Sequence, residues 1–173
     1  MTSALARAAE LRHDEAMRIS HEVRYDASVE DVYTMLTDPA FRERASRAQG
    51  ATSVDVKVDG GEVRITMVTP NTDIPAFARK IAGESVTVVQ AESWSDDAYE
   101  CDFSVSPQGL PARITGTRTL VEDGTGTLDV FEGEAHAKVP LVGGKLEGLL
   151  RDKLTHGWDT EHTLGVTWLA SQR

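Results

Sequence analysis

The sequence ends in one long segment with helical periodicity, and this segment limits the folds that the chain can adopt. From about residue 143 to 171, apolar side chains recur at intervals of three or four residues and form one seam along a helix. A helix of this length would extend about 40 Å at 1.5 Å per residue, enough to lie across a whole β-sheet. The seam consists of Leu146, Leu150, Leu154, Trp158, Leu164 and Trp168, with Glu161 interrupting it.

The segments before this helix alternate between apolar and polar residues, which is the pattern of half-buried strands. The clearest example places Tyr99, Cys101 and Phe103 on one face and charged or hydroxyl residues on the other. Glycine-containing turns such as 59–61 and 123–126 favour tight hairpins. Strands joined by short turns pair as antiparallel neighbours, so we expect one curved antiparallel sheet. The predicted strands are residues 18–25, 52–58, 63–67, 85–93, 99–106, 112–122 and 127–139.

Two short helices are expected after the first strand. Ser28 and Asp31 resemble a helix N-cap, and apolar residues continue at helical spacing until Pro39 removes a backbone donor. A second helix is predicted at 40–48 and another short one at 74–81. Residues 1–16 are polar and rich in alanine, so we interpret them as an N-terminal extension to a single domain at 17–173, with Met17 as an alternative start.

This order of elements resembles the helix-grip fold of the START-like superfamily (SRPBCC), an α+β fold in which a curved antiparallel sheet of about seven strands wraps around a long C-terminal helix. Segments 25–39 and 139–147 resemble an actinobacterial START-like family of unknown function. The resemblance implies a cavity between sheet and helix that holds a hydrophobic small molecule. At the junction before the long helix, we expect Pro140 to end strand pairing and Gly143 and Gly144 to let the backbone reverse.

Composition and motifs exclude several function classes. The chain has 28 acidic and 18 basic side chains, and its net charge of −10 repels nucleic acids and anionic membranes unless a basic face is segregated, which no Lys/Arg block indicates. Gly143-Gly144-Lys145 lacks the other residues of a P-loop. We expect no cofactor. A single cysteine, no signal sequence and no apolar run of membrane-spanning length favour a soluble cytoplasmic protein without stable membrane insertion.

Few residues of the sequence are candidates for catalysis or for binding a polar group. Pairing of Leu120 with Leu128 would place Arg118, Glu134 and His136 on one inward face, where they could orient a polar group or move protons. The alternative is a bulge that buries Phe131 and Ala135 and leaves the charges in water. Since His156 and His162 are six residues apart, they do not form a metal pair, and we predict no metal site.

The remaining candidates are apolar or aromatic. Glu161 is either a carboxylate in the cavity or a seam residue beyond the sheet edge. The other predicted ligand contacts are Tyr99, Phe103, Leu150, Leu154 and Trp158.

Three functions are consistent with these residues. The first is a binding protein for a lipid or polyketide-like metabolite, and the second is a cyclase or hydratase that uses Arg118, Glu134 and His136. The third is a domain with a filled core that serves as a protein-interaction module. The oligomeric state, the ligand and any catalysis stay open at this stage.

Overall fold

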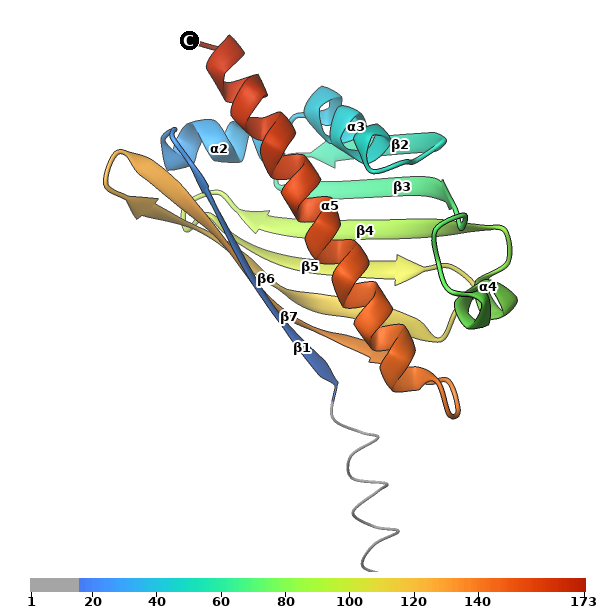
Figure 1. Cartoon of the computed structure of the whole chain (residues 1–173). Helices are drawn as coiled ribbons and strands as arrows, with labels where there is room; N and C mark the ends of the chain where they lie inside the picture. The colour runs from blue at the N-terminus through green and yellow to red at the C-terminus, as the bar shows by residue number, and fades with distance from the viewer. Residues whose placement is uncertain (1–15) are drawn as a thin grey trace, which may run out of the picture.

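The computed structural model describes residues 16–173, which form a seven-stranded antiparallel sheet and four helices (Figure 1). The strand order is β1-β7-β6-β5-β4-β3-β2, so the strands of every neighbouring pair except β1 and β7 follow one another in the sequence. The predicted extension 1–16 lies outside the described residues except for Ala16, and its boundary stays a prediction. The strands are β1 Met17–Tyr25, β2 Ser53–Asp59, β3 Glu62–Pro70, β4 Ser85–Ser95, β5 Glu100–Pro107, β6 Ala112–Asp123 and β7 Gly126–Ala137.

One long helix crosses the concave face of the sheet. This helix, α5, extends over Gly143–Ser171, while α2 (Val29–Leu36) and α3 (Pro39–Ala48) lie beside its C-terminal half and α4 (Ala76–Ala82) lies near its start (Figure 1). The predicted helix-grip fold and its element order are therefore confirmed.

Local chemistry explains where the short helices begin. The Ser28 hydroxyl accepts a hydrogen bond from the Asp31 N–H at 3.1 Å, as the sequence predicts. Asp38 caps α3 in the same way, with its carboxylate 2.8 Å from the Ala40 N–H. Val32 and Leu36 of α2 are fully buried, so the capped helix directs its apolar face toward the core.

A pair of glycines allows β6 and β7 to approach each other closely. Gly116 lies opposite Gly133, and a Cβ on Gly116 would lie only 2.2 Å from the Glu132 carbonyl oxygen. A side chain at this position would push the strands apart. The two glycines therefore belong to the bend of the sheet around α5.

The connection from β7 to α5 differs from the expected glycine hinge. Leu141 has the left-handed φ of 68°, whereas Gly143 and Gly144 have negative φ. Gly143 is needed for a different reason, because a Cβ there would lie 2.9 Å from the Ala137 carbonyl oxygen. Glu147 is buried and accepts the Ala137 N–H at 3.0 Å, which fixes the first turn of α5 against the end of β7.

Among residues 16–173, no helix is both long and apolar enough to cross a membrane.

Candidate functional site

The pairing of β6 with β7 determines which side chains face the space between the sheet and α5, which we call the grip. Leu120 pairs with Asp129, and Val121 pairs with Leu128, so the expected pairing of Leu120 with Leu128 is wrong by one residue. Because side chains alternate along a strand, this shift moves every side chain of β7 to the other face. The residues of β7 that face the helix are Thr127, Asp129, Phe131, Gly133, Ala135 and Ala137.

The proposed constellation of Arg118, Glu134 and His136 is consequently not formed. Arg118 is 1% exposed and faces inward, while Glu134 is exposed on the opposite face together with Glu132. His136 alternates onto that outer face as well and is half-buried. The considered bulge is also absent, since β6 and β7 pair continuously over the described strands from Asp123 with Gly126 to Ala112 with Ala137.

Arg118 instead belongs to a buried ionic network of five side chains. Its guanidinium binds Asp129 through Nε at 2.9 Å and Nη2 at 2.6 Å, and Nη2 also lies 2.7 Å from Glu161 Oε1. Arg42 donates to both oxygens of Glu92, at 3.1 and 2.5 Å. Longer ion pairs of 3.8 Å from Arg42 to Glu161 and 3.9 Å from Arg118 to Glu92 join the two halves.

Five elements supply one member each to this ionic network: α3, β4, β6, β7 and α5. Each of the five side chains is at most 6% exposed, so their charges interact with little screening by water. Further donors satisfy Glu92, since Trp94 Nε1 lies 2.8 Å and Gln90 Nε2 lies 2.7 Å from its oxygens. Such a network favours one arrangement of helix over sheet, because moving α5 or α3 relative to the sheet would separate buried charges from their partners.

The network shifts the pKa values of Glu92 and Asp129 in opposite directions. Burial alone would raise the pKa of Glu92, but the charges of Arg42 and Arg118 outweigh it and lower the pKa to about 2. Burial dominates at Asp129 and raises the pKa of this carboxyl, although Arg118 opposes the shift. Three carboxyl groups share two guanidinium groups. At Asp129 the effect of burial exceeds that of the neighbouring guanidinium, so its pKa is raised.

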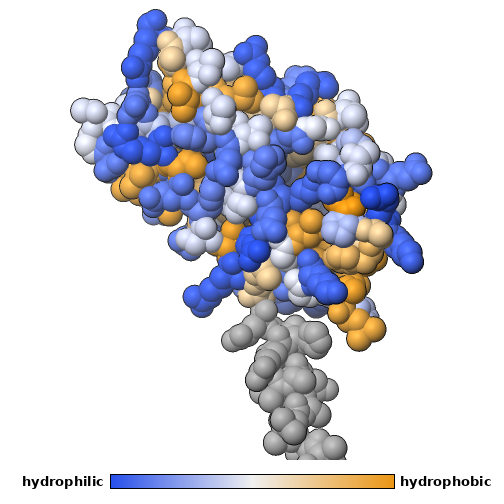
Figure 2. Space-filling view, viewed as in Figure 1, coloured by the Kyte–Doolittle hydropathy of each residue, from blue (hydrophilic) through white to orange (hydrophobic). Residues whose placement is uncertain are grey.

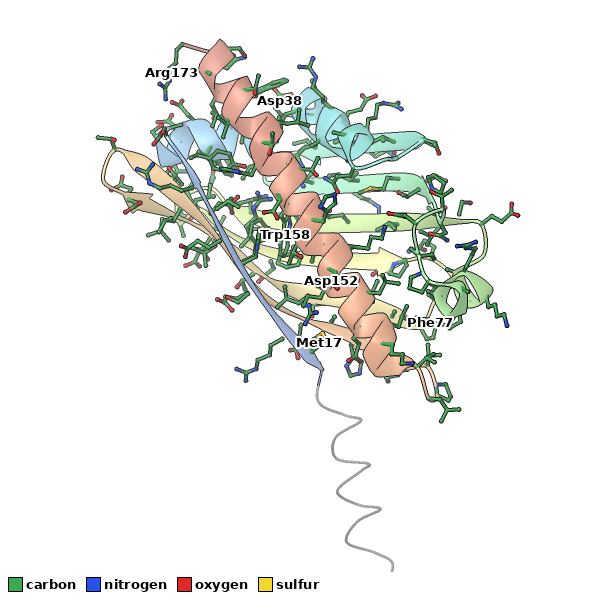
Figure 3. The ribbon with its side chains drawn as sticks, viewed as in Figure 1. Met17, Asp38, Phe77, Asp152, Trp158 and Arg173 are labelled. Carbon is green, nitrogen blue, oxygen red and sulfur yellow. The ribbon has the colours of Figure 1, made fainter. Side chains whose placement is uncertain are left out.

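Aromatic side chains fill the space next to the ionic network. Trp158 lies about half-way along α5 (Figure 3). It stacks on Phe131 with ring centroids 3.6 Å apart, contacts Phe103 edge-on at 5.7 Å and stacks on His21 at 5.8 Å. The Arg118 guanidinium lies 4.4 Å from the centre of the Phe131 ring. The middle of the grip is therefore packed.

Inward-facing side chains are less completely buried toward the end where α5 begins. Val88 and Val105 of the sheet and Leu150 and Leu154 of α5 face the core but are only half-buried, and Gln90 separates them from the ionic network. We refer to these five residues as the half-open end. The opposite end is closed, because α2 and α3 insert side chains such as Leu36 and Phe41 that are fully buried.

The predicted contacts are thus distributed over three places. Leu150 and Leu154 lie at the half-open end, with Phe103 and Trp158 at its inner boundary, whereas Arg118 and Glu161 lie in the ionic network. Tyr99 lies at the closed end, where its ring contacts Tyr33 edge-on at 5.4 Å.

Sequence reasoning did not single out Arg42, Glu92 or Asp129. The sequence did contain one indication of a buried charge. Glu92 alternates with Gln90 and Trp94 on the face of β4 that is turned toward the helix. Within residues 16–173, no group of three or more His, Cys, Asp or Glu side chains is arranged to hold a metal ion.

A small pocket lies outside the grip. It has a volume of about 190 Å³ and is bounded by α2 and the C-terminal end of α5, including Asp31, Thr34 and Trp168. None of its lining residues comes from a strand.

The fold and the comparisons with known proteins define a protein with the START-like helix-grip fold. Residues 20–169 match the sequence model of a family described as "Protein of unknown function (DUF2505)", and the chain belongs to this family. No curated protein matches the sequence.

Solved structures with the same fold come from distant proteins. TTHA0849 from Thermus thermophilus is 18% identical with a TM-score of 0.65, and the match covers 90% of this chain and 98% of that one. The Zhui aromatase/cyclase from Streptomyces sp. R1128 is 11% identical with a TM-score of 0.66, covering 90% and 94%. Norcoclaurine synthase from Thalictrum flavum, in complex with dopamine and hydroxybenzaldehyde, is 17% identical with a TM-score of 0.59, covering 87% and 86%. At these identities the likeness shows the fold alone.

Proposed function

We propose that the protein binds an apolar small molecule, such as a lipid or a polyketide-like metabolite, between the sheet and the first half of α5. The observation that carries this proposal is the half-open end, where Val88, Val105, Leu150 and Leu154 face the core without being fully buried. When a ligand covers apolar side chains that are partly exposed on an inward face, it removes them from water and the free energy of the system falls.

The surrounding residues limit how deeply the ligand can enter and how it can be oriented. Phe103 and Trp158 would form the inner wall, and the packed aromatic rings behind them prevent deeper entry. Gln90 is half-buried beside Val105 and uses its amide nitrogen to bind Glu92, so its amide is a polar group at the edge of this space. A ligand with an apolar body and at most one hydrogen-bonding group near Gln90 fits these contacts.

The cyclase or hydratase hypothesis loses its supporting constellation. It requires Arg118, Glu134 and His136 on one face, and the structure separates them. Arg118 also has its guanidinium bound to Asp129 and Glu161, which stabilises its charge but leaves it remote from a substrate. The solved structures named as an aromatase/cyclase and a norcoclaurine synthase support a small organic ligand, whereas the three residues that this hypothesis names do not meet on one face.

Native mass spectrometry of protein purified from its own host, followed by organic extraction, tests the proposal directly. A stoichiometric apolar molecule that co-purifies and is removed by extraction would support it. Empty protein that also binds no member of a lipid and metabolite panel would contradict it and favour a filled-core interaction module.

A leucine substitution can locate the ligand. Leu154→Asn replaces a half-buried side chain at the half-open end, and Leu164→Asn is the matched control because Leu164 is half-buried on the same helix at the closed end. We expect the affinity for the apolar fluorophore 1-anilinonaphthalene-8-sulfonate to fall about tenfold in the first variant and little in the second. Equal losses in titrations of the two variants would place the fluorophore elsewhere.

A further inference from the structure

Leu141 projects from the molecule at the tip of the loop between β7 and α5. Its side chain is 93% exposed, which is the largest exposure among the large apolar residues of the described chain. The backbone holds it at φ 68°, a left-handed conformation that a branched side chain rarely adopts. Asn, Asp or Gly would fit this position better, so the folded protein retains an apolar side chain in water at some cost.

A second group of partly exposed apolar side chains comes from α4 and the residues just before it. Ile81 is 36% exposed, and Ile74 and Phe77 are half-buried. Of the seven residues of α4, only Ala78 is buried, so most of this helix surface faces outward.

The two groups lie at the same end of the molecule. Lys145, in the first turn of α5 shortly after Leu141, lies with Nζ 6.0 Å from the centre of the Phe77 ring. The Lys153 ammonium binds Asp73 at 2.6 Å, which joins α5 to the loop before α4. Figure 1 places α4 beside the start of α5, and Figure 2 shows apolar surface gathered over this corner.

This end is basic although the chain as a whole is strongly acidic. Segments 73–84 and 136–153 contain six basic and four acidic side chains, against 18 and 28 in the whole chain. Of those four acidic groups, Asp73 is paired with Lys153 and Glu147 is buried. The sequence contains no Lys/Arg block, but these basic residues come from two segments that the contacts of Lys145 with Phe77 and of Lys153 with Asp73 hold at the same end. We name the following residues the basic apolar tip: Ile74, Phe77, Arg79, Lys80, Ile81, Lys138, Leu141 and Lys145.

We propose that the basic apolar tip docks reversibly on a bilayer that contains anionic phospholipid. Leu141 and the apolar side chains of α4 would enter the headgroup region, while Arg79, Lys80, Lys138 and Lys145, all exposed, would contact lipid phosphates. An aliphatic side chain on a protruding loop suits a soft lipid surface. A specific protein interface would instead be expected to present a flat area with buried aromatic anchors.

Docking and the proposed ligand site are separate features of the same end. The basic apolar tip can bind a bilayer whether or not the half-open end holds a ligand. If both are correct, docking would bring Leu150 and Leu154 toward the membrane from which an apolar ligand could enter.

Vesicle flotation with the full chain tests the docking surface. Vesicles of pure phosphatidylcholine are compared with vesicles in which about a third of the lipid is phosphatidylglycerol, at low and at high salt. We expect binding only to the anionic vesicles and its loss at high salt, because screening weakens the contacts of exposed lysines.

Two variants make the test specific. Leu141→Asp should reduce vesicle binding about tenfold or more, and Lys145→Glu should do the same. Val166→Asp is the matched control, since Val166 is 49% exposed on the other half of α5 and should have little effect. Aspartate tolerates the left-handed backbone better than leucine, so Leu141→Asp should fold normally and bind 1-anilinonaphthalene-8-sulfonate as the wild type does.

Equal binding to both kinds of vesicle, or equal effects of Leu141→Asp and Val166→Asp, would overturn the proposal. So would a protein that floats with neither vesicle but is retained on an immobilised acidic peptide through Leu141 and Lys145, since the partner would then be an acidic protein. Because fluorophore binding is measured separately, failure of docking is distinguishable from failure of the proposed ligand site.

Discussion

At the scale of single residues, Glu92 shows how strongly the buried ionic network depends on its charges. Its folded-state pKa of about 2 lies below the ordinary value of 4.5, which means that folding favours the ionised carboxylate. The stabilisation is therefore fully present above pH 4.5 and is lost as the pH falls toward 2. The difference in pKa corresponds to about 3 kcal/mol.

Glu92→Gln should lower the free energy of unfolding by about 3 kcal/mol at pH 7, since Arg42 loses its buried partner. The difference from wild type should shrink as the pH falls below 4.5, because Glu92 of the unfolded wild-type chain then binds a proton that the folded carboxylate does not take up until the pH approaches 2. Urea denaturation between pH 7 and 3 measures both effects, and Asp129 is present in both proteins. Glu100→Gln, at an exposed position on β5, should change the stability by less than about 0.5 kcal/mol. A difference that is constant with pH would show that the charge of Glu92 does not stabilise the fold.

At the scale of elements, the glycine pair of β6 and β7 carries a prediction about the sheet. Gly116→Ala would place its Cβ against the backbone of Glu132 and Gly133 and should destabilise the protein by about 3 kcal/mol. Gly148→Ala is the contrasting change, because its Cβ would meet only Met17 Cε at 3.8 Å and alanine favours the helix by up to about 1 kcal/mol. Urea midpoints compare the two variants, and a neutral Gly116→Ala would argue against a close approach of the strands.

The elements themselves could be predicted because periodicity and turn residues are local properties. The register of β6 against β7 could not, since it depends on one residue of loop length. The expected pairing needs a three-residue loop at 123–125, whereas Asp123 pairs with Gly126 and leaves only Gly124 and Thr125 in the turn. Gly124 supports this tighter turn with its φ of 61°. One residue decided whether Asp129 or Leu128 entered the core.

The candidate site was harder to predict than the fold for a related reason. Charged residues are mostly exposed, so Arg42 or Asp129 alone gives no sign of burial. Their burial becomes favourable only when α3, β4, β6, β7 and α5 bring opposite charges together. Local sequence patterns do not report such long-range pairing. Arg118 was therefore predicted to face inward, but its partners Asp129 and Glu161 were not predicted.

At the scale of the whole molecule, the two ends of the grip differ in how firmly they are held. The C-terminal half of α5 buries Trp158, Glu161 and Leu169 against the sheet and the neighbouring helices. The other end contains α4, which buries only Ala78 and begins at Ala76 without a side-chain cap. Local opening needs less free energy where fewer side chains are buried.

Hydrogen exchange should therefore separate the two ends. We expect the amides of α4 to exchange about a hundredfold faster than those of residues 158–169, and an apolar ligand at the half-open end should slow exchange in α4 and in residues 146–154 only. Mass spectrometry of peptides from the full chain, with and without 1-anilinonaphthalene-8-sulfonate, measures both quantities. Equal protection of α4 and residues 158–169 would contradict the difference in stability. Protection that appears instead at α2 and the end of α5 would assign the ligand to the small pocket beside Trp168, because those elements line it and the half-open end does not contact them.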